Sequence, residues 1–355
     1  MPIQAIALFA ALLVQGQGTL QSTDTVIGAG REAQAKDIVT VEYTGTLSDG
    51  KVFDSSKDHG PIAFVLGEGH VIKGWDQGIL GMKVGGKRHL VIPPDLGYGD
   101  QAVGGGLIPA KSTLTFDVEL LRVDRAGDPL KIDLKTTGAG KGDAAKPGDE
   151  VVLNWKGAFL DGFEFVNTYT AKQPTTIFLE RPGLPAGFNQ ALAGIKPGEK
   201  RHAVIPYNLA YGPDGLHNTA VGPYSTLVLD IEAVQVTPAA QAFERDKKKL
   251  KIEEEAPGSG PAVKTGDHVL IQFTVTLEDG KKIFSTSDAG QPAPYDVGSA
   301  RVTRGFDVGI VGMKAGGKRK LTMPPDLAFG ATGTQNGIPP NATLIIDVEV
   351  VKINP

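Results

Sequence analysis

The sequence predicts an α+β protein built from three tandem copies of one small domain, each an antiparallel sheet with a single short helix on one face. Three observations predict it. The segment 81–99 (GMKVGGKRHLVIPPDLGYG) recurs at 194–212 and again at 312–330, at the spacing of whole domains. Around it, apolar residues alternate as in half-buried strands, and one short stretch has helical spacing. The 355 residues also include 47 Gly and 24 Pro, which favours many turns and short strands.

The elements of the first copy follow from its periodicity. Strands are expected, in chain order, at 38–49, 51–54, 61–66, 87–92 and 112–123. Asp49-Gly50 is a strong turn signal between the first two strands. Residues 71–80 predict the helix, because Val71, Ile72, Trp75 and Ile79 would share one face. One helix among many strands is typical of the α+β class, with the helix covering one face of the sheet.

The repeats also set the domain boundaries. We expect domains at 19–124, 129–236 and 250–355. A linker helix is expected at 237–249, because Thr237-Pro238 is typical of a cap followed by a proline in the first helical turn. The lysines that end this helix are followed by Glu253, Glu254 and Glu255, which indicates a solvated face rather than a nucleic-acid patch.

Residues 1–18 have the pattern of a signal peptide. The apolar run 5–14 (AIALFAALLV) suits the core of a secretory signal, and it falls short of the roughly 20 residues that span a bilayer. Gly16 and Gly18 supply small residues before a cleavage site after Gly18. No Lys or Arg precedes the run, and a buried first strand or a cloning remnant is the alternative. We expect export to a periplasmic or extracellular location; without a signal, the protein would be cytoplasmic.

Composition and charge exclude several classes of function. The chain has no Cys, which excludes disulfides, thiolate nucleophiles and cysteine metal sites. The six His show no metal-ligand spacing, and we expect neither a metal nor another cofactor. A net charge of −4 gives no reason to expect nucleic acid or an anionic membrane as partner. The segment 81–87 has the pattern GxxxxGK, but the Ser or Thr of a phosphate loop does not follow it.

Separate elements of domain one carry an aromatic set. Its members are Tyr43, Phe53, Phe64, Trp75, Tyr98 and Phe116. By themselves they indicate either an ordinary core, since aromatic residues dominate burial in small domains, or a ligand pocket.

Four motifs in domain one resemble the FKBP-type peptidyl-prolyl isomerases. They are VEYTGTLSDGKVFDSS (41–56), PIAFVLGEGHVIKGWDQGI (61–79), IPPDLGYG (92–99) and IPAKSTLTFDVELL (108–121). They occur in the family's order and spacing and cover nearly all of the domain. The resemblance implies a curved antiparallel sheet wrapped around one short helix, with an apolar pocket between them. It implies proline-containing unfolded or nascent polypeptides as partners, a role in protein folding, and macrolides of the FK type as ligands.

The resemblance also implies roles for individual residues. Trp75 would form the floor of the pocket, Tyr98 would donate a hydrogen bond to a substrate carbonyl, and Asp54 would be the polar group at the rim. We expect these three to be catalytic. The substrate-binding residues would be Tyr43, Phe53, Ile62, Val71, Ile72, Leu107, Ile108 and Phe116. Leu107 and Ile108 would lie on a loop that closes over the pocket. Ile62 departs from the aromatic residue frequent in the family, which implies changed preference rather than loss.

The second and third copies keep the glycines, prolines and closing strand but lose site residues. In copy two, the positions of Tyr43, Asp54, Ile72, Trp75 and Phe116 hold Trp155, Val166, Pro185, Phe188 and Leu229. In copy three, those of Tyr43, Ile72, Trp75, Tyr98 and Phe116 hold Phe273, Thr303, Phe306, Phe329 and Ile346, and around 283–284 no carboxylate takes the place of Asp54. We expect an active first domain and degenerate sites in the others. The alternative is a non-catalytic peptide-binding chaperone or scaffold that uses the fold in all three copies.

Overall fold

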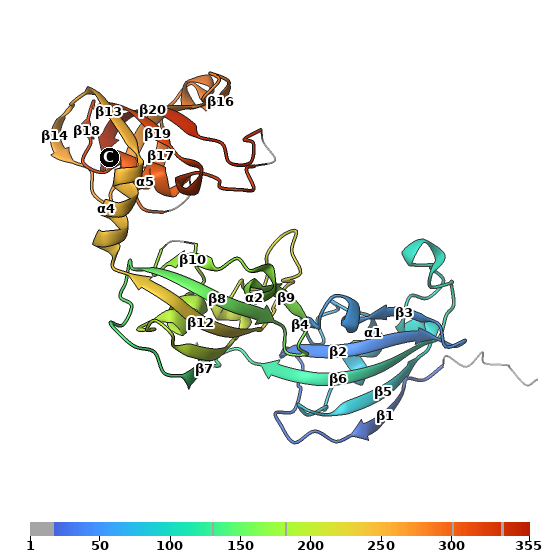
Figure 1. Ribbon diagram of the computed structural model, residues 1–355. Coiled ribbons are helices and arrows are strands. Elements are labelled where there is room, and N and C mark those ends of the chain that lie inside the picture. The colour runs from blue at the N-terminus through green and yellow to red at the C-terminus, as the bar shows by residue number, and fades with distance from the viewer. Residues whose placement is uncertain (1–17, 130, 182, 300–301, 335–336) are drawn as a thin grey trace, which may run out of the picture. The chain divides into compact units, whose positions relative to one another are not determined.

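Three six-stranded antiparallel sheets organise the protein in its computed structural model (Figure 1). The structure describes residues 18–129, 131–181, 183–299, 302–334 and 337–355; the expected signal peptide lies almost wholly outside them. By packing, the chain forms two compact units. One holds the described residues up to Asp133 together with 156–167 and 204–229, and the other holds 134–155, 168–203 and 230–355. The first sheet lies wholly in the first unit and the third sheet wholly in the second.

The first sheet has the strand order β1-β5-β6-β2-β3, with β4 paired to β2. Its strands are β1 (Gln21–Val26), β2 (Ile38–Leu47), β3 (Val52–Ser55), β4 (Ile62–Val65), β5 (Lys87–Ile92) and β6 (Leu114–Asp124). One α-helix, α1 (Lys73–Gly78), and three short 3-10 turns accompany them: η1 (Ser56–Asp58), η2 (Pro94–Leu96) and η3 (Gly104–Gly106). The expected antiparallel sheet with one short helix is therefore confirmed for this copy.

The second sheet repeats this topology in the order β7-β11-β12-β8-β10, with β9 paired to β8. Its strands are β7 (Asp133–Gly138), β8 (Glu150–Ala158), β9 (Glu164–Asn167), β10 (Thr175–Phe178), β11 (Lys200–Ile205) and β12 (Leu227–Thr237). Its helical segments are α2 (Thr168–Ala171), α3 (Ala186–Leu192) and η4 (Tyr207–Leu209). Helix α4 (Ala239–Lys249) follows, at the residues for which a connecting helix was expected.

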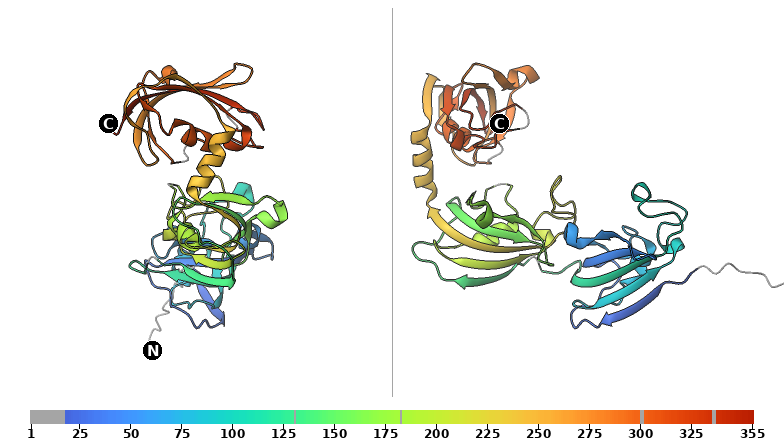
Figure 2. Two further views of the ribbon diagram at one scale, coloured as in Figure 1. Left: turned by 60° about the vertical axis from the view of Figure 1, so that its left-hand side comes forward. Right: turned by 45° about the vertical axis from the view of Figure 1, so that its right-hand side comes forward.

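The third sheet has the order β13-β19-β20-β15-β16, with β17 paired to β15. Its strands are β13 (Lys251–Ala256), β15 (His268–Leu277), β16 (Lys282–Ser285), β17 (Ala293–Asp296), β19 (Lys318–Met323) and β20 (Leu344–Ile353). The short β14 (Ser259–Ala262) and β18 (Lys314–Ala315) pair separately. Helical segments are η5 (Thr286–Ala289), α5 (Arg304–Ile310) and η6 (Pro325–Leu327). Figure 2 shows this sheet, in orange and red, curving around the short helix α5.

The core of domain one lies between α1 and the concave face of its sheet. Strand β2 pairs along its whole length with β6, and both strands point alternate residues inward as their sequence pattern predicts. From β2, Val39, Val41 and Tyr43 are buried. From β6, Leu114 and Phe116 meet them across the same face. This layer positions the aromatic side chains that line the site.

Helix α1 is shorter than expected. The predicted helix over 71–80 is wrong at its start: Val71 precedes the helix, and Ile72 is its extended N-cap residue, with φ −61° and ψ 147°. The helix also contains two glycines, and close packing against β5 explains both. A Cβ on Gly74 would lie 2.4 Å from Cγ2 of Ile92, and one on Gly78 would lie 2.8 Å from Cδ2 of Leu90. Close packing on β5 therefore requires Gly at both positions, and tertiary contacts stabilise a helix of poor intrinsic propensity.

The edge strand β1 was not predicted. All six of its residues are exposed, so its sequence has no alternation of apolar and polar residues that would indicate a strand. The strand forms because it pairs with β5, from Gln21 opposite Val91 to Val26 opposite Lys87. Arg88 reinforces the pairing by donating from Nε to Asp24 at 2.6 Å.

Candidate functional site

A cavity of about 210 Å³ opens between α1 and the first sheet. Ten residues line it: Tyr43, Phe53, Asp54, Ile62, His70, Val71, Ile72, Trp75, Tyr98 and Phe116. They come from β2, β3, β4, β6, α1 and the segments that flank η2 and α1. Nine of them are residues that the resemblance assigned to the site, and eight of the ten are apolar or aromatic without charge.

Trp75 occupies the centre of the aromatic cluster. Its side chain is 4% exposed, and its ring meets the edges of Tyr43 and Phe116 at centroid distances of 5.0 and 5.1 Å. Phe53 stands at 89° to Phe116, 5.5 Å away. Such edge-to-face pairs hold rings in fixed orientations. The indole Nε1 is buried and has no hydrogen-bond partner among the described residues.

Tyr43 and Asp54 form the polar corner of the cavity. The hydroxyl of Tyr43 donates to Oδ2 of Asp54 at 2.5 Å. Burial, and then the adjacent Asp54 carboxylate, raise the pKa of Tyr43 far above its ordinary value of 10.0. The phenol therefore keeps its proton and holds the carboxylate at the rim. Asp54 lies opposite Gly45 in the β2–β3 pairing, which leaves space beside it for the rings of Phe53 and Phe116.

Tyr98 supplies a free donor. It follows η2 in the segment between β5 and β6, and its side chain lines the cavity while remaining 38% exposed. Within the described residues its hydroxyl makes no hydrogen bond. Burial, followed by the charge of Asp54, raises the pKa of Tyr98 above 10.0. The hydroxyl is thus protonated at neutral pH and available to a ligand acceptor.

Two expected residues do not line the cavity. Ile108 is 6% exposed and belongs to the core, and Leu107 is 38% exposed on the segment after η3. A bridge between Val103 and Ile108 turns this segment back on itself. The expectation that Leu107 and Ile108 bind substrate from a loop that closes over the pocket therefore stays a prediction.

Two histidines of the site were missed. His70 lines the cavity immediately before Val71, and Nε2 of His59 lies 3.2 Å from Oδ1 of Asp54. A histidine in a loop carries no periodic signal. Only the position of η1 beside β3 brings His59 to the carboxylate.

Strand register confirms the substitutions in the other copies. Val166 lies opposite Gly157 as Asp54 lies opposite Gly45, and Phe284 takes the corresponding place opposite Val275. Trp155 meets Phe188 edge to face, with ring centroids 6.0 Å apart. Neither copy therefore has a carboxylate at the position of Asp54.

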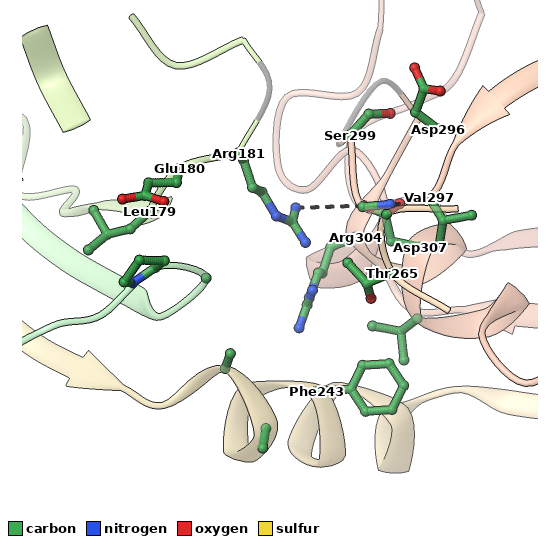
Figure 3. A pocket seen from close by; sticks show the side chains of 17 residues that line it. Leu179, Glu180, Arg181, Phe243, Thr265, Asp296, Val297, Ser299, Arg304 and Asp307 are labelled. Carbon is green, nitrogen blue, oxygen red and sulfur yellow. Dashed lines mark hydrogen bonds and ion pairs between the residues drawn. The ribbon is translucent and has the colours of Figure 1, made fainter. Parts of the chain in front are cut away.

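A larger cavity, of about 660 Å³, lies in the second compact unit (Figure 3). Its charges are matched by neighbouring residues: Arg304 donates from Nε to Asp246 at 2.7 Å, and Arg181 lies 3.6 Å from Asp307. Tyr295 donates to Asp307 as well, at 2.6 Å. Polar side chains dominate the labelled residues in Figure 3, and Phe243 is the one Phe, Tyr or Trp among the described lining residues, against five in the cavity of domain one. The smaller cavity of domain one is the better candidate.

The part of the chain that the structure describes holds no group of three His, Asp or Glu side chains that could bind a metal ion. No helix in the same residues is long and apolar enough to cross a membrane.

Fold and site together define a class of protein: α+β domains with a small pocket lined by aromatic side chains and a tyrosine hydroxyl that has no hydrogen-bond partner among the described residues. A family profile described as FKBP-type peptidyl-prolyl cis-trans isomerase matches residues 29–121, 141–234 and 260–351. The chain belongs to this family, with three tandem copies of its domain.

Two curated relatives agree with this assignment. The human protein named peptidyl-prolyl cis-trans isomerase FKBP10 is 34% identical over 325 residues, which cover 91% of this chain and 55% of the relative. FK506-binding protein 1A of Neurospora crassa is 51% identical over 110 residues, 31% of this chain and 82% of the relative. The solved structure of the three FKBP domains of wheat FKBP73 is 25% identical, covers 61% of this chain and 94% of its own, and has a TM-score of 0.29. The chain spans about half the length of the curated relatives that it matches over most of its residues.

Proposed function

We propose that domain one catalyses cis–trans rotation about X-Pro bonds in polypeptides and so assists their folding. One observation carries the proposal: Tyr98, whose hydroxyl makes no hydrogen bond among the described residues, lines the same aromatic cavity as the buried Trp75. Proline-containing unfolded or nascent chains are the proposed substrates. Macrolides of the FK type are proposed ligands of the same cavity, as the name of the Neurospora relative suggests.

The chemistry needs no covalent step. Rotation of the peptide bond meets a barrier of about 18–20 kcal/mol because the amide loses its resonance. That resonance separates charge, so water favours the planar amide. A dry aromatic cavity disfavours charge separation and therefore favours the twisted amide relative to the planar one. Catalysis follows if the cavity binds the twisted state more tightly than either planar isomer.

Each polar group has a proposed part in this selectivity. The ring of Trp75 contacts the proline ring, and the aromatic walls exclude water. Tyr98 donates to a backbone carbonyl oxygen of the substrate and orients the chain over the cavity. Asp54, held by Tyr43, stands at the rim where the flanking residues leave the cavity. Positioning of this kind accelerates a reaction by ordering the substrate before the barrier is crossed.

Removing both polar groups tests the proposal. In the full chain, Tyr98→Phe with Asp54→Val should lower kcat/KM for a short X-Pro peptide by about 10- to 100-fold, since one lost interaction with the transition state changes a rate by about tenfold per 1.4 kcal/mol. A protease-coupled isomerisation assay measures the rate. The matched control is Tyr211→Phe, the corresponding tyrosine of the second copy, which should leave the rate unchanged.

If wild type and the double variant are equally slow, the isomerase proposal fails. Peptide binding without catalysis then becomes the better interpretation, because the second and third copies keep the scaffold without the Asp54 carboxylate. Export remains a prediction that rests on the apolar run 5–14.

A further inference from the structure

His59 places both of its ring nitrogens against oxygen acceptors. Nδ1 lies 2.8 Å from the carbonyl oxygen of Gly60, and Nε2 lies 3.2 Å from Oδ1 of Asp54. A carbonyl oxygen and an ionised carboxylate can only accept hydrogen bonds. Neutral imidazole has a single N–H, so either tautomer leaves one ring nitrogen facing an acceptor without a hydrogen between them. Only the imidazolium donates to both oxygens at once.

The surroundings of His59 leave Asp54 as its principal partner. Asp54 comes from β3, and the ring of Tyr43 from β2 lies 6.2 Å from the imidazole. The turn η1, which His59 follows directly, contributes Lys57 and Asp58, and their charges are opposite in sign. The remaining titratable groups of the cavity are Tyr98 and His70. The side chains of His59 and Asp54 are 44% and 46% exposed, so the pair exchanges protons directly with solvent.

We propose that His59 sets the charge of the cavity rim and thereby selects among the residues that flank the substrate proline. This rests on the isomerase function proposed above. As imidazolium, His59 and Asp54 together carry no net charge; with His59 neutral, the rim carries the charge of Asp54 alone. A cavity of about 210 Å³ receives the proline ring, so flanking side chains lie at the rim. The imidazolium and the neutral imidazole therefore give the rim different charges, and the selection differs between the two forms.

The direction of the effect follows from charge repulsion. A substrate with Glu before proline is repelled by an unshielded Asp54 and tolerated when His59 is charged. A substrate with Gln at that position is indifferent. The ratio of kcat/KM for Glu-Pro over Gln-Pro peptides should therefore fall about two- to fivefold from pH 5.5 to pH 8, the size expected of partly exposed charges. Substrate Glu is already ionised at about pH 5.5, so it contributes little to the change.

Two-site exchange between cis and trans peptide signals in NMR measures these rates without a protease. Taking the ratio of two substrates at each pH cancels any titration that affects both. KM rather than kcat should carry the effect, because a charge outside the reacting bond acts on ground and transition states alike. The same ratio appears in binding, followed by Trp75 fluorescence in a Trp155→Phe background, which removes the second of the two tryptophans.

Substitutions that fix the charge at position 59 test whether His59 causes the pH dependence of the ratio. His59→Arg should keep the ratio high at all pH values, and His59→Gln should keep it low at all pH values. The control is His89→Gln, which alters another His–Asp pair of domain one, with Nδ1 2.7 Å from Asp117, outside the cavity lining. It should retain the pH dependence of wild type.

A ratio that still falls with pH in His59→Arg would overturn the inference. So would loss of the pH dependence in His70→Gln while His59→Gln keeps it. Both outcomes leave the isomerase proposal standing. Absence of turnover in wild type would instead remove the isomerase proposal, and the binding ratio would then show separately whether His59 sets the rim charge.

Discussion

At the residue scale, the two tyrosines of the site differ in their hydrogen bonds: Tyr43 holds Asp54 in position, and the hydroxyl of Tyr98 is available to a ligand. Tyr43 and Tyr98 both line the cavity, and both have a raised pKa. The hydroxyl of Tyr43 donates its hydrogen bond to Asp54, whereas the hydroxyl of Tyr98 makes no hydrogen bond within the part of the chain that is described. The two roles follow from position in the sheet, since the pairing of β2 with β3 brings Tyr43 beside Asp54. The aromatic pattern in the sequence identified both residues but could not assign these roles.

Buried Asp37 gives a prediction about acid stability. Arg125 donates from Nε and Nη2 to its two oxygens, both at 2.6 Å. This bond lowers the pKa of Asp37 below its ordinary value of 3.8, so the stabilisation is present above that value and is lost as the pH falls through the lowered pKa. Arg125→Met should therefore lower the free energy of unfolding at pH 7 and flatten its decline in acid, because the buried Asp37 loses its charged partner.

Urea unfolding of the Trp155→Phe protein, followed by Trp75 fluorescence, measures this loss for domain one. The control is Lys87→Met, which breaks the exposed pair with Glu119 and should change stability much less, because solvent screens exposed ion pairs. Equal effects of the two substitutions at pH 7 would contradict the role given to Asp37.

At the element scale, α1 shows where periodicity stops being informative. The spacing of Val71, Ile72, Trp75 and Ile79 correctly indicated a helix here, yet the chain enters it only at Lys73. Val71 and Ile72 remain in the cavity wall because the extended segment before the helix presents them there. Apolar spacing therefore located the helix but not its first residue.

Gly74 is the position at which helix propensity and packing disagree. Alanine is favoured over glycine in a helix by about 1 kcal/mol, but a Cβ here would lie 2.4 Å from Cγ2 of Ile92. We expect Gly74→Ala to destabilise domain one by about 1–3 kcal/mol, because overpacking a rigid contact exceeds the gain in propensity. Gln77→Ala, at an exposed position of the same helix, should be neutral or slightly stabilising. Thermal unfolding compares the two, and a stabilised Gly74→Ala protein would show that α1 can move away from β5.

At the scale of the whole molecule, three copies of one topology carry unequal sites. The strand order is repeated in all three sheets. The buried helix face and the closing strand are repeated too, since they build each core. Tyr98 and Asp54 contribute little to that core, so their replacement in the third copy by Phe329 and Phe284 leaves the fold intact.

This inequality predicts a binding stoichiometry. Titration of the full chain with an FK-type macrolide should give one high-affinity site per chain, because domain one alone among the copies has the Asp54 carboxylate together with the Tyr98 hydroxyl. Isothermal titration calorimetry measures the number directly. The Tyr98→Phe, Asp54→Val protein should lose that site, and a stoichiometry near three would show that the other copies bind equally well.

The sequence by itself determined the threefold repeat, the α+β class and most strands of domain one, because these follow from local periodicity and residue type. Periodicity left the aromatic set open between a core and a pocket, and the resemblance of its motifs to a known family implied nine of the ten residues that line the cavity. The tertiary structure decided the start of α1 and the existence of β1. It also decided the burial of Ile108 in the core and the placement of His59 beside Asp54. Each of these depends on groups brought together from different segments, and their free energy arises only when those segments pack.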